Sequence, residues 1–240
     1  DASFHSGNNI AVNDQEGTSA GFFDGATGSF TIAETNKSGE DFRWHGRLEY
    51  VNGHHLRFAG SGQYYLKNGA DSPENFLGYV DFDGTSDQGG IPVPDFPDSF
   101  LHEYAPHIPD WNSGDPTWGA DQRGKGIIGA LNYLASQRVN SIYFLTYNVD
   151  GGDGADTWPW TGPNERLRFD VSKLDQWDIV FQHAQRNGIQ LHVVTQETEN
   201  DAALGEDGLS TQRALYYREL VARFGYHPVL QWNIGEENNN

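Results

Sequence analysis

A helix that leads into a strand is clearest in KLDQWDIVFQHAQRNG (173–188) and IQLHVVTQ (189–196). In the first stretch Leu174, Trp177 and Val180 recur at helical spacing, and Gly188 is placed to end the helix. The second stretch is an apolar run of the length that a buried strand has. These residues predict a helix followed at once by a strand of a packed sheet.

The same order recurs on both sides of this unit. GIIGALNYLASQ (126–137) precedes SIYFLTY (141–147), and STQRALYYRELVARFG (210–225), with Ser210 as its predicted N-cap, precedes HPVLQWNIG (227–235). Strands separated by helices indicate parallel βαβ units with right-handed crossovers, which is an α/β fold. The pattern leaves a barrel and an open doubly wound sheet as alternatives. The chain lacks the glycine-rich motifs of nucleotide-binding folds, which weakens the second.

Upstream of residue 125 the sequence does not show this alternation of helix and strand. Residues 1–60 are predicted to be β-rich, with strands in GSFTI (28–32), GRLEYV (46–51) and HHLRFAG (54–60). YYLK (64–67) is predicted as the first strand of the α/β part, and the Asp-, Gly- and Pro-rich stretch at about 76–125 as a long insertion. We therefore expect a boundary near residue 60, with the α/β part over 61–240.

The composition excludes several classes of function. The 240 residues carry a formal charge of −19, so a nucleic-acid backbone would be repelled. No apolar run approaches the length of a membrane span, so we expect no membrane partner. The absence of cysteine removes disulfide scaffolds, thiolate metal sites and cysteine nucleophiles together. Because the chain also contains no methionine, we expect a fragment or a processed form.

Polar side chains follow each predicted strand at its carboxyl end. They are Asp71, Glu74 and Asn75 after the first, Tyr147 and Asn148 after the second, Gln196 and Glu197 after the third, and Glu236 and Glu237 after the fourth. In parallel α/β folds these ends meet and form the active site. Sugar hydroxyls need paired donors and acceptors, and glycosidic cleavage needs two carboxyl groups. The residues predict a sugar site, with helix capping as the alternative for any single position.

Two further features of the sequence support the prediction of a sugar site. Glu236 and Glu237 are adjacent carboxyl groups directly after an apolar strand, so one can be held protonated as a general acid while the other assists it. Trp158 and Trp160 lie in a polar, glycine-rich loop, where flat rings could stack on pyranose faces. The alternative is that these rings fasten the loop to the sheet, as we expect of Trp177 within its helix.

No cofactor or metal site is predicted. Asp81 and Asp83 lie in an Asp-Phe-Asp-Gly stretch that has the oxygen-rich appearance of a Ca²⁺ loop. It does not match the full spacing of such a loop, and Asp-Gly turn formation is the preferred interpretation.

Four stretches carry a resemblance to a known family. HHLRFAGSGQYYLKNGADSPENFLGYVDFDGT (54–85), GKGIIGALNYLAS (124–136), FLTYNVDGGDGADTWPW (144–160) and LYYRELVARFGYHPVLQWNIGEEN (215–238) are similar to a group of mostly uncharacterised bacterial glycoside hydrolases. Those proteins have a β-sandwich ahead of a clan A-like (β/α)₈ barrel. The resemblance implies that residues 1–60 are the tail of the sandwich and that 61–240 are the first half of a TIM-like barrel.

The resemblance also implies a retaining glycoside hydrolase, secreted to the exterior or the periplasm, that acts on a polysaccharide or oligosaccharide. WNIGEE is similar to the family's strand-four motif if Glu237 takes the acid/base position and Glu236 the position of the usual Asn. The family's nucleophile follows strand seven, so we expect this chain to lack it and to associate with the other barrel half or with itself. The alternative is a non-catalytic carbohydrate-binding or surface-assembly protein.

Overall fold

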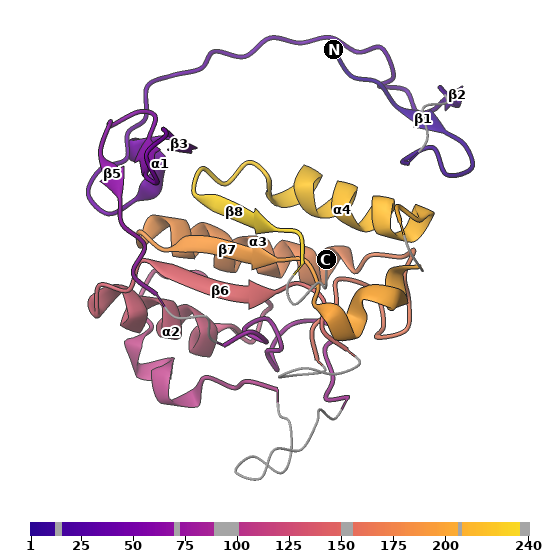
Figure 1. Cartoon of the computed structure of the whole chain (residues 1–240). Coiled ribbons are helices and arrows are strands. Elements are labelled where there is room, and N and C mark those ends of the chain that lie inside the picture. The colour runs from indigo at the N-terminus through magenta and orange to yellow at the C-terminus, as the bar shows by residue number, and fades with distance from the viewer. Residues whose placement is uncertain (13–15, 70–72, 89–100, 150–155, 206–207, 236–240) are drawn as a thin grey trace.

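The central feature of the structure is a three-stranded parallel sheet. The computed structural model describes residues 1–12, 16–69, 73–88, 101–149, 156–205 and 208–235. The sheet contains, in spatial order, β6 (Ser141–Leu145), β7 (Gln190–Val194) and β8 (Leu230–Asn233). Each strand follows a helix, and these are α2 (Lys125–Ser136), α3 (Val171–Arg186) and α4 (Thr211–Phe224) (Figure 1). The chain is thus a mixed α/β protein, and the predicted alternation of helix and strand is confirmed.

The three helices share one face of this sheet. Alternate strand residues join one core with them, namely Ile142, Phe144, Leu191, Val193, Leu230 and Trp232. The intervening residues Tyr143, Leu145 and Val194 form a separate cluster, which no helical residue of the described chain joins. Crossovers that progress in one direction across a sheet give this arrangement. The described strands follow the singly wound pattern of a barrel, and closure of a barrel stays a prediction.

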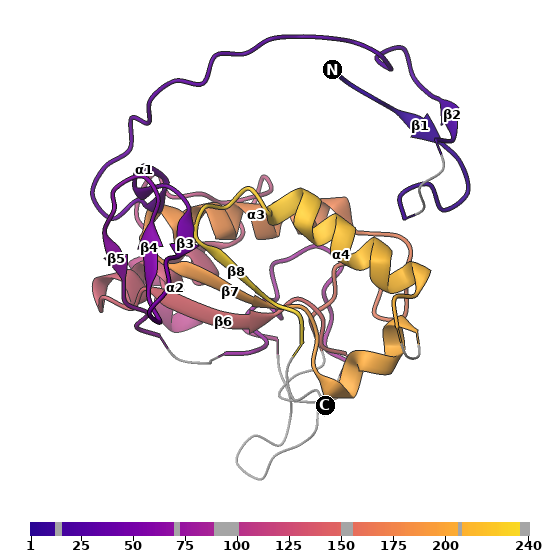
Figure 2. The same cartoon turned by 45° about the horizontal axis from the view of Figure 1, so that its top comes forward.

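The strand predicted at 64–67 is present in part, but it does not belong to the parallel sheet as predicted. β5 (Tyr64–Tyr65) pairs antiparallel with β4 (Leu56–Phe58), which pairs antiparallel with β3 (Leu48–Tyr50). The Tyr65 hydroxyl donates to the carbonyl of Asn140 (2.7 Å), just before β6, and the Leu48 amide donates to the carbonyl of Pro228 (3.0 Å), just before β8. This small sheet therefore lies at the amino ends of the parallel strands, opposite the predicted site (Figure 2).

The chain beyond β5 takes the edge position beside β6 instead. The Asn140 amide donates to the carbonyl of Asn68 (2.9 Å), and the Leu145 amide donates to the carbonyl of Glu74 (2.8 Å). Both partners advance along the chain together, as in a parallel pairing. The described residues 68–69 and 73–75 thus form an edge segment beside β6, where the sequence predicted the first strand.

The N-terminal 60 residues form fewer strands than predicted. The predicted strands at 46–51 and 54–60 are confirmed as β3 and β4, and β1 (His5–Ser6) pairs with β2 (Thr18–Ser19). GSFTI (28–32) forms no strand, because Phe30 and Ile32 have no surface to pack against and are each 87% exposed. A short helix, α1 (Phe42–His45), was not predicted. A β-sandwich in this region stays a prediction.

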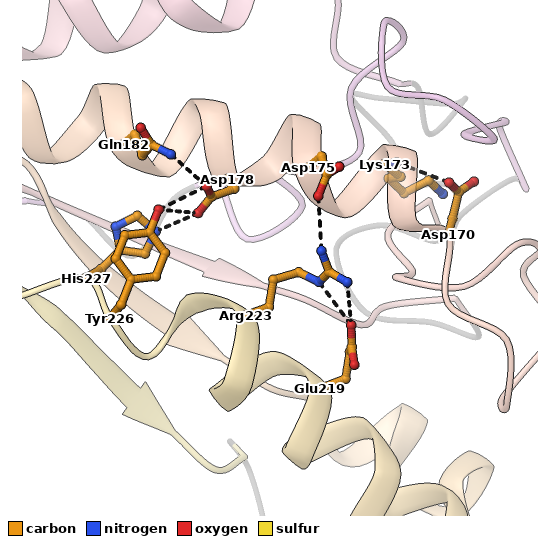
Figure 3. A network of polar contacts seen from close by, with 9 residues as sticks. All are labelled: Asp170, Lys173, Asp175, Asp178, Gln182, Glu219, Arg223, Tyr226 and His227. Atoms are coloured by element: carbon orange, nitrogen blue, oxygen red, sulfur yellow. Dashed lines mark hydrogen bonds and ion pairs between the residues drawn. The ribbon is translucent and has the colours of Figure 1, made fainter. Parts of the chain in front are cut away.

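Polar contacts fasten α4 and β8 to α3 (Figure 3). The Asp178 carboxylate accepts hydrogen bonds from the Tyr226 hydroxyl (2.7 Å), His227 Nε2 (3.1 Å) and Gln182 Nε2 (2.7 Å). Burial alone would raise the pKa of Asp178, but these hydrogen bonds lower it below its ordinary value. The turn that leads into β8 is thereby fixed, and so is the position at which β8 ends.

The predicted N-cap of α4 is confirmed, and so is the glycine predicted to end α3. The Ser210 hydroxyl accepts a hydrogen bond from the Arg213 amide (3.0 Å), as expected for the N-cap of α4. Gly188 follows α3 with φ +69°, where a Cβ would lie 2.9 Å from the carbonyl oxygen of Glu40. The α3–β7 connection therefore requires glycine at this position.

Candidate functional site

The carboxyl ends of β6 and β7 are joined by buried amide side chains. Asn200 belongs to the 3₁₀ helix η2 (Thr198–Leu204) that follows β7, and its Nδ2 donates to Asn148 Oδ1 (3.4 Å). Asn200 Oδ1 in turn accepts from the Val149 amide (3.1 Å). Asn148 and Asn200 are both fully buried. The structure thus brings together the strand ends that the sequence singled out.

The loop after β6 also contacts the chain that follows the edge segment. Asn148 and Thr157 exchange two backbone hydrogen bonds of 2.9 and 3.0 Å. A Cβ added to Gly78 would lie 3.4 Å from Asp156 Cβ and 3.6 Å from Thr157 Oγ1, so the chain just after Asn75 packs directly on this loop. The ends of the edge segment, β6 and β7 therefore form one contiguous polar region.

His102 supports Asn75 in this region, and no motif in the sequence indicated this role. Its Nε2 lies 2.7 Å from Asn75 Oδ1, and its ring stacks on Tyr104 with centroids 4.9 Å apart. Burial lowers the pKa of His102, which keeps the imidazole neutral at pH 7. His102 therefore holds the amide of Asn75 in one orientation.

A second cluster of polar side chains begins directly after β7. Gln196 and Glu197 are both buried, and Gln196 Nε2 donates to Asp201 Oδ1 (2.9 Å). The same oxygen accepts from Arg213 Nη1 (2.7 Å), which lies in the first turn of α4. This ion pair fixes η2, and with it Gln196, against the following helix.

The predicted role of Trp158 and Trp160 as exposed sugar platforms is wrong. Their side chains are 1% and 0% exposed. Trp160 contacts Tyr147 edge-on with ring centroids 5.0 Å apart and stacks on Phe169 at 6.1 Å. The Asn148–Thr157 pairing turns the loop back onto the sheet and carries both rings into the core. The expected core position of Trp177 is confirmed.

Lys173 lies beneath this loop. Its side chain is 1% exposed, and its Nζ lies 4.5 Å from the centre of the Trp158 ring and donates to the carbonyls of Gly84 (3.2 Å) and Trp158 (3.3 Å). Burial lowers the pKa of Lys173 to about 8. The ammonium group thus fixes the loop to the start of α3, and its desolvation is unfavourable to folding.

We expect Lys173→Met to change how stability depends on pH. Below pH 8 the lysine is charged in both states, and folding bears the full desolvation penalty. Between about pH 8 and the ordinary value of 10.5 the unfolded chain binds more protons, so stability of the natural protein rises with pH. Across this range the unfolding free energy of the natural protein should therefore rise by about 3 kcal/mol relative to that of the variant. Urea titrations at several pH values measure it, and a flat difference, like that expected for the exposed Lys37→Met, would contradict this account.

The Asp81 and Asp83 carboxylates are occupied by protein groups. Asp81 Oδ2 accepts from the Tyr79 hydroxyl (2.7 Å) and the Gly124 amide (2.9 Å) at the start of α2. Asp83 accepts from Arg123 Nη1 (2.8 Å) and from a serine hydroxyl of α3. Among the described residues, no group of three or more His, Cys, Asp or Glu side chains is placed to hold a metal ion. In the same residues no helix is long and apolar enough to cross a bilayer.

The remaining predicted residues lie in different parts of the chain. Asp71, Glu236 and Glu237 lie outside the described residues. Glu74 contributes a backbone carbonyl to the sheet edge and is half-buried. Of the predicted residues, Asn148 pairs with Thr157 and contacts Asn200 of η2, a helix to which Gln196 is also bonded. Asn75 lies in the turn whose Gly78 packs on Thr157.

Comparisons with known proteins give limited matches. No protein-family model and no curated protein matches the sequence. Among solved structures, a candidate glycoside hydrolase from Bacteroides vulgatus superposes with a TM-score of 0.49 at 12% identity, covering 83% of this chain and 33% of that one. A glycoside hydrolase of family 5 from the same organism gives a TM-score of 0.46 at 14% identity, covering 85% and 35%. The chain thus spans about a third of either protein. Both TM-scores are below 0.5, so neither match assigns a function to this chain.

Proposed function

We propose that this chain belongs to a carbohydrate-active enzyme, a retaining glycoside hydrolase with its site at the carboxyl ends of the parallel strands. The observation that carries the proposal is the contiguous polar region formed by Asn75, Asn148, Thr157 and Asn200 at that edge. Amide and hydroxyl groups held at strand ends are suited to the paired donors and acceptors of sugar hydroxyls.

Glu237 is assigned as the general acid/base and Glu236 as the group that assists it. Both follow β8 in the sequence, and β8 is the next strand after β7 in the sheet. In the retaining mechanism the acid protonates the leaving oxygen while a second carboxylate, about 5–5.5 Å away, attacks the anomeric carbon. The acid then acts as a base and removes a proton from water. We assign no residue of this chain to the second carboxylate.

The test combines binding and product analysis. The protein, in the form that its gene encodes, is incubated with neutral and acidic oligosaccharides, and mass spectrometry monitors binding and release of shorter sugars. Binding with cleavage at retained anomeric configuration supports the proposal. Binding without cleavage would favour the carbohydrate-binding alternative, and no binding to any oligosaccharide would overturn both.

Asn148→Ala is expected to weaken oligosaccharide binding by about tenfold, since it removes a buried hydrogen-bonding group from the site. Asn112→Ala changes an exposed asparagine in the insertion and serves as the matched control. Equal affinities of the two variants, measured by calorimetry, would place the binding site elsewhere.

A further inference from the structure

Buried hydrogen-bonding atoms without partners gather around the loop that follows β6. Within the described chain, the nitrogen and hydroxyl atoms of this kind on residues 148–166 are Asn148 Nδ2, Thr157 Oγ1, Trp158 Nε1, Trp160 Nε1 and Arg166 Nε. The asparagine, tryptophan and arginine atoms are donors, and the threonine hydroxyl can also donate. A buried donor without an acceptor is destabilising by about 1–3 kcal/mol in general, so such a set signals bound water or a ligand. This set favours a ligand rich in acceptor oxygens.

Arg166 adds a fixed positive charge to these donors. Its Cζ lies 4.9 Å from the centre of the Tyr147 ring and 5.0 Å from that of Trp160, so the guanidinium stacks on two buried rings. Its Nη1 donates to the carbonyls of Pro163 (2.6 Å) and Glu165 (2.7 Å). These contacts hold the planar group in one orientation against the Tyr147 and Trp160 rings.

Arg166 also has no carboxylate partner in the part of the chain that the structure describes. The arginines that do form ion pairs there are Arg43, Arg47, Arg123, Arg213 and Arg223. The carboxylate of the adjacent Glu165 accepts from the Arg166 and Leu167 amides (2.8 Å each) and not from the Arg166 guanidinium. The Nε edge of a guanidinium binds carboxylates in a forked, charge-assisted geometry, and in Arg166 the Nε hydrogen lacks an acceptor.

Two buried acidic groups belong to the same polar region. Asp156 and Glu197 are both buried at the same strand ends, and Asp156 Oδ1 accepts from the Gln88 amide (2.7 Å). They exclude a densely charged anion, such as a sulfated chain, more strongly than they exclude one carboxylate. The balance favours a sugar with a single acidic group.

We infer that the site takes a hexuronic acid residue, with the sugar carboxylate on Arg166 and the donors of the β6 loop around it. This inference rests on the proposed carbohydrate function and adds the substrate class to it. Arg166 acts as a specificity-determining residue, and Asn148 and Thr157 accommodate the oxygens beside the carboxylate.

The test uses ligand pairs that differ only at C6. Oligomers of glucuronate and galacturonate are compared with those of glucose and galactose in calorimetric titrations of the natural protein. We expect the acidic member of at least one pair to bind at least tenfold more tightly at low salt, with the preference reduced at high salt. Tighter binding of the neutral member, or no preference, would overturn the inference and leave the proposed function intact. The absence of binding to all four would overturn the proposed function itself.

Arg166→Gln is expected to remove this preference, lowering affinity for the acidic oligomer by about 10- to 100-fold and changing affinity for the neutral one little. Arg168→Gln is the matched control, because Arg168 is an exposed arginine two residues away. Arg166→Lys keeps the charge without the fork and should retain part of the preference, which keeps the test valid if Arg166→Gln is unstable by thermal melting. Equal loss in the Arg168 and Arg166 variants would show a general charge effect and overturn the inference.

Discussion

Replacing Glu237 with glutamine is expected to lower kcat by about 10²–10⁴-fold with little change in oligosaccharide affinity. Glutamine keeps the shape of the side chain and its capacity for hydrogen bonding, but it cannot supply a proton to the leaving oxygen. Substrates with a good leaving group need less protonation, so the loss should be smaller for aryl glycosides than for oligosaccharides. Steady-state kinetics on the protein as its gene encodes it measures both effects.

The matched control is Glu199→Gln, because Glu199 is an exposed glutamate close after β7 in the sequence. It should leave kcat unchanged. If Glu237→Gln and Glu199→Gln have the same kinetics, Glu237 is not the acid. If Glu236→Gln alone abolishes turnover, the two adjacent roles are exchanged.

Phe181→Ala is expected to reduce the unfolding free energy by about 3–5 kcal/mol, the largest stability effect that we predict. The Phe181 ring is completely buried on α3, with its centroid 5.4 Å from that of Phe144 on β6 and 4.9 Å from that of Phe224 on α4. It therefore joins the sheet to two of its helices, and its loss leaves a cavity between them.

Urea unfolding followed by tryptophan fluorescence measures this change. Leu209→Ala, at a position that is 74% exposed, should alter stability by no more than about 0.5 kcal/mol. A loss for Phe181→Ala as small as that of the control would mean that α3 and α4 do not share a core with β6. In that case the singly wound arrangement would be wrong.

The part of the fold that follows regular periodicity could be predicted from the sequence. Apolar residues at helical spacing located α2, α3 and α4, and the short apolar runs between them located β6, β7 and β8. Ser210 was also predictable as a cap, because a hydroxyl before a helix satisfies an amide that has no other partner. These signals are local, and a single sequence contains them in full.

Pairing between distant segments was not predictable in the same way. YYLK looks like any short buried strand, and only its pairing with β4 shows that it belongs to the small antiparallel sheet. Similarly, Trp158 and Trp160 lie among polar loop residues, but the pairing of Asn148 with Thr157 turns them inward. His102 was missed because its contact with Asn75 joins positions 27 residues apart.

The candidate site was predictable in its location but only partly in its members. Asn75, Asn148 and Gln196 lie at strand ends as expected, since the carboxyl ends of parallel strands meet at one edge. Arg166 and Thr157 belong to a loop, where residue type alone says little about position. The roles that we propose for them rest on buried atoms without partners and on ring contacts.

The most direct test of a carbohydrate site at the strand ends is a titration of the ¹⁵N-labelled 240-residue chain with oligosaccharide, followed by amide chemical shifts. The probes are the galacturonate and galactose oligomers. We expect the amide shifts of Asn148, Thr157 and Gln196 to change and to saturate with ligand, while those of the β3–β5 sheet stay unchanged. Shifts confined to that small sheet, or none with either probe, would contradict this expectation.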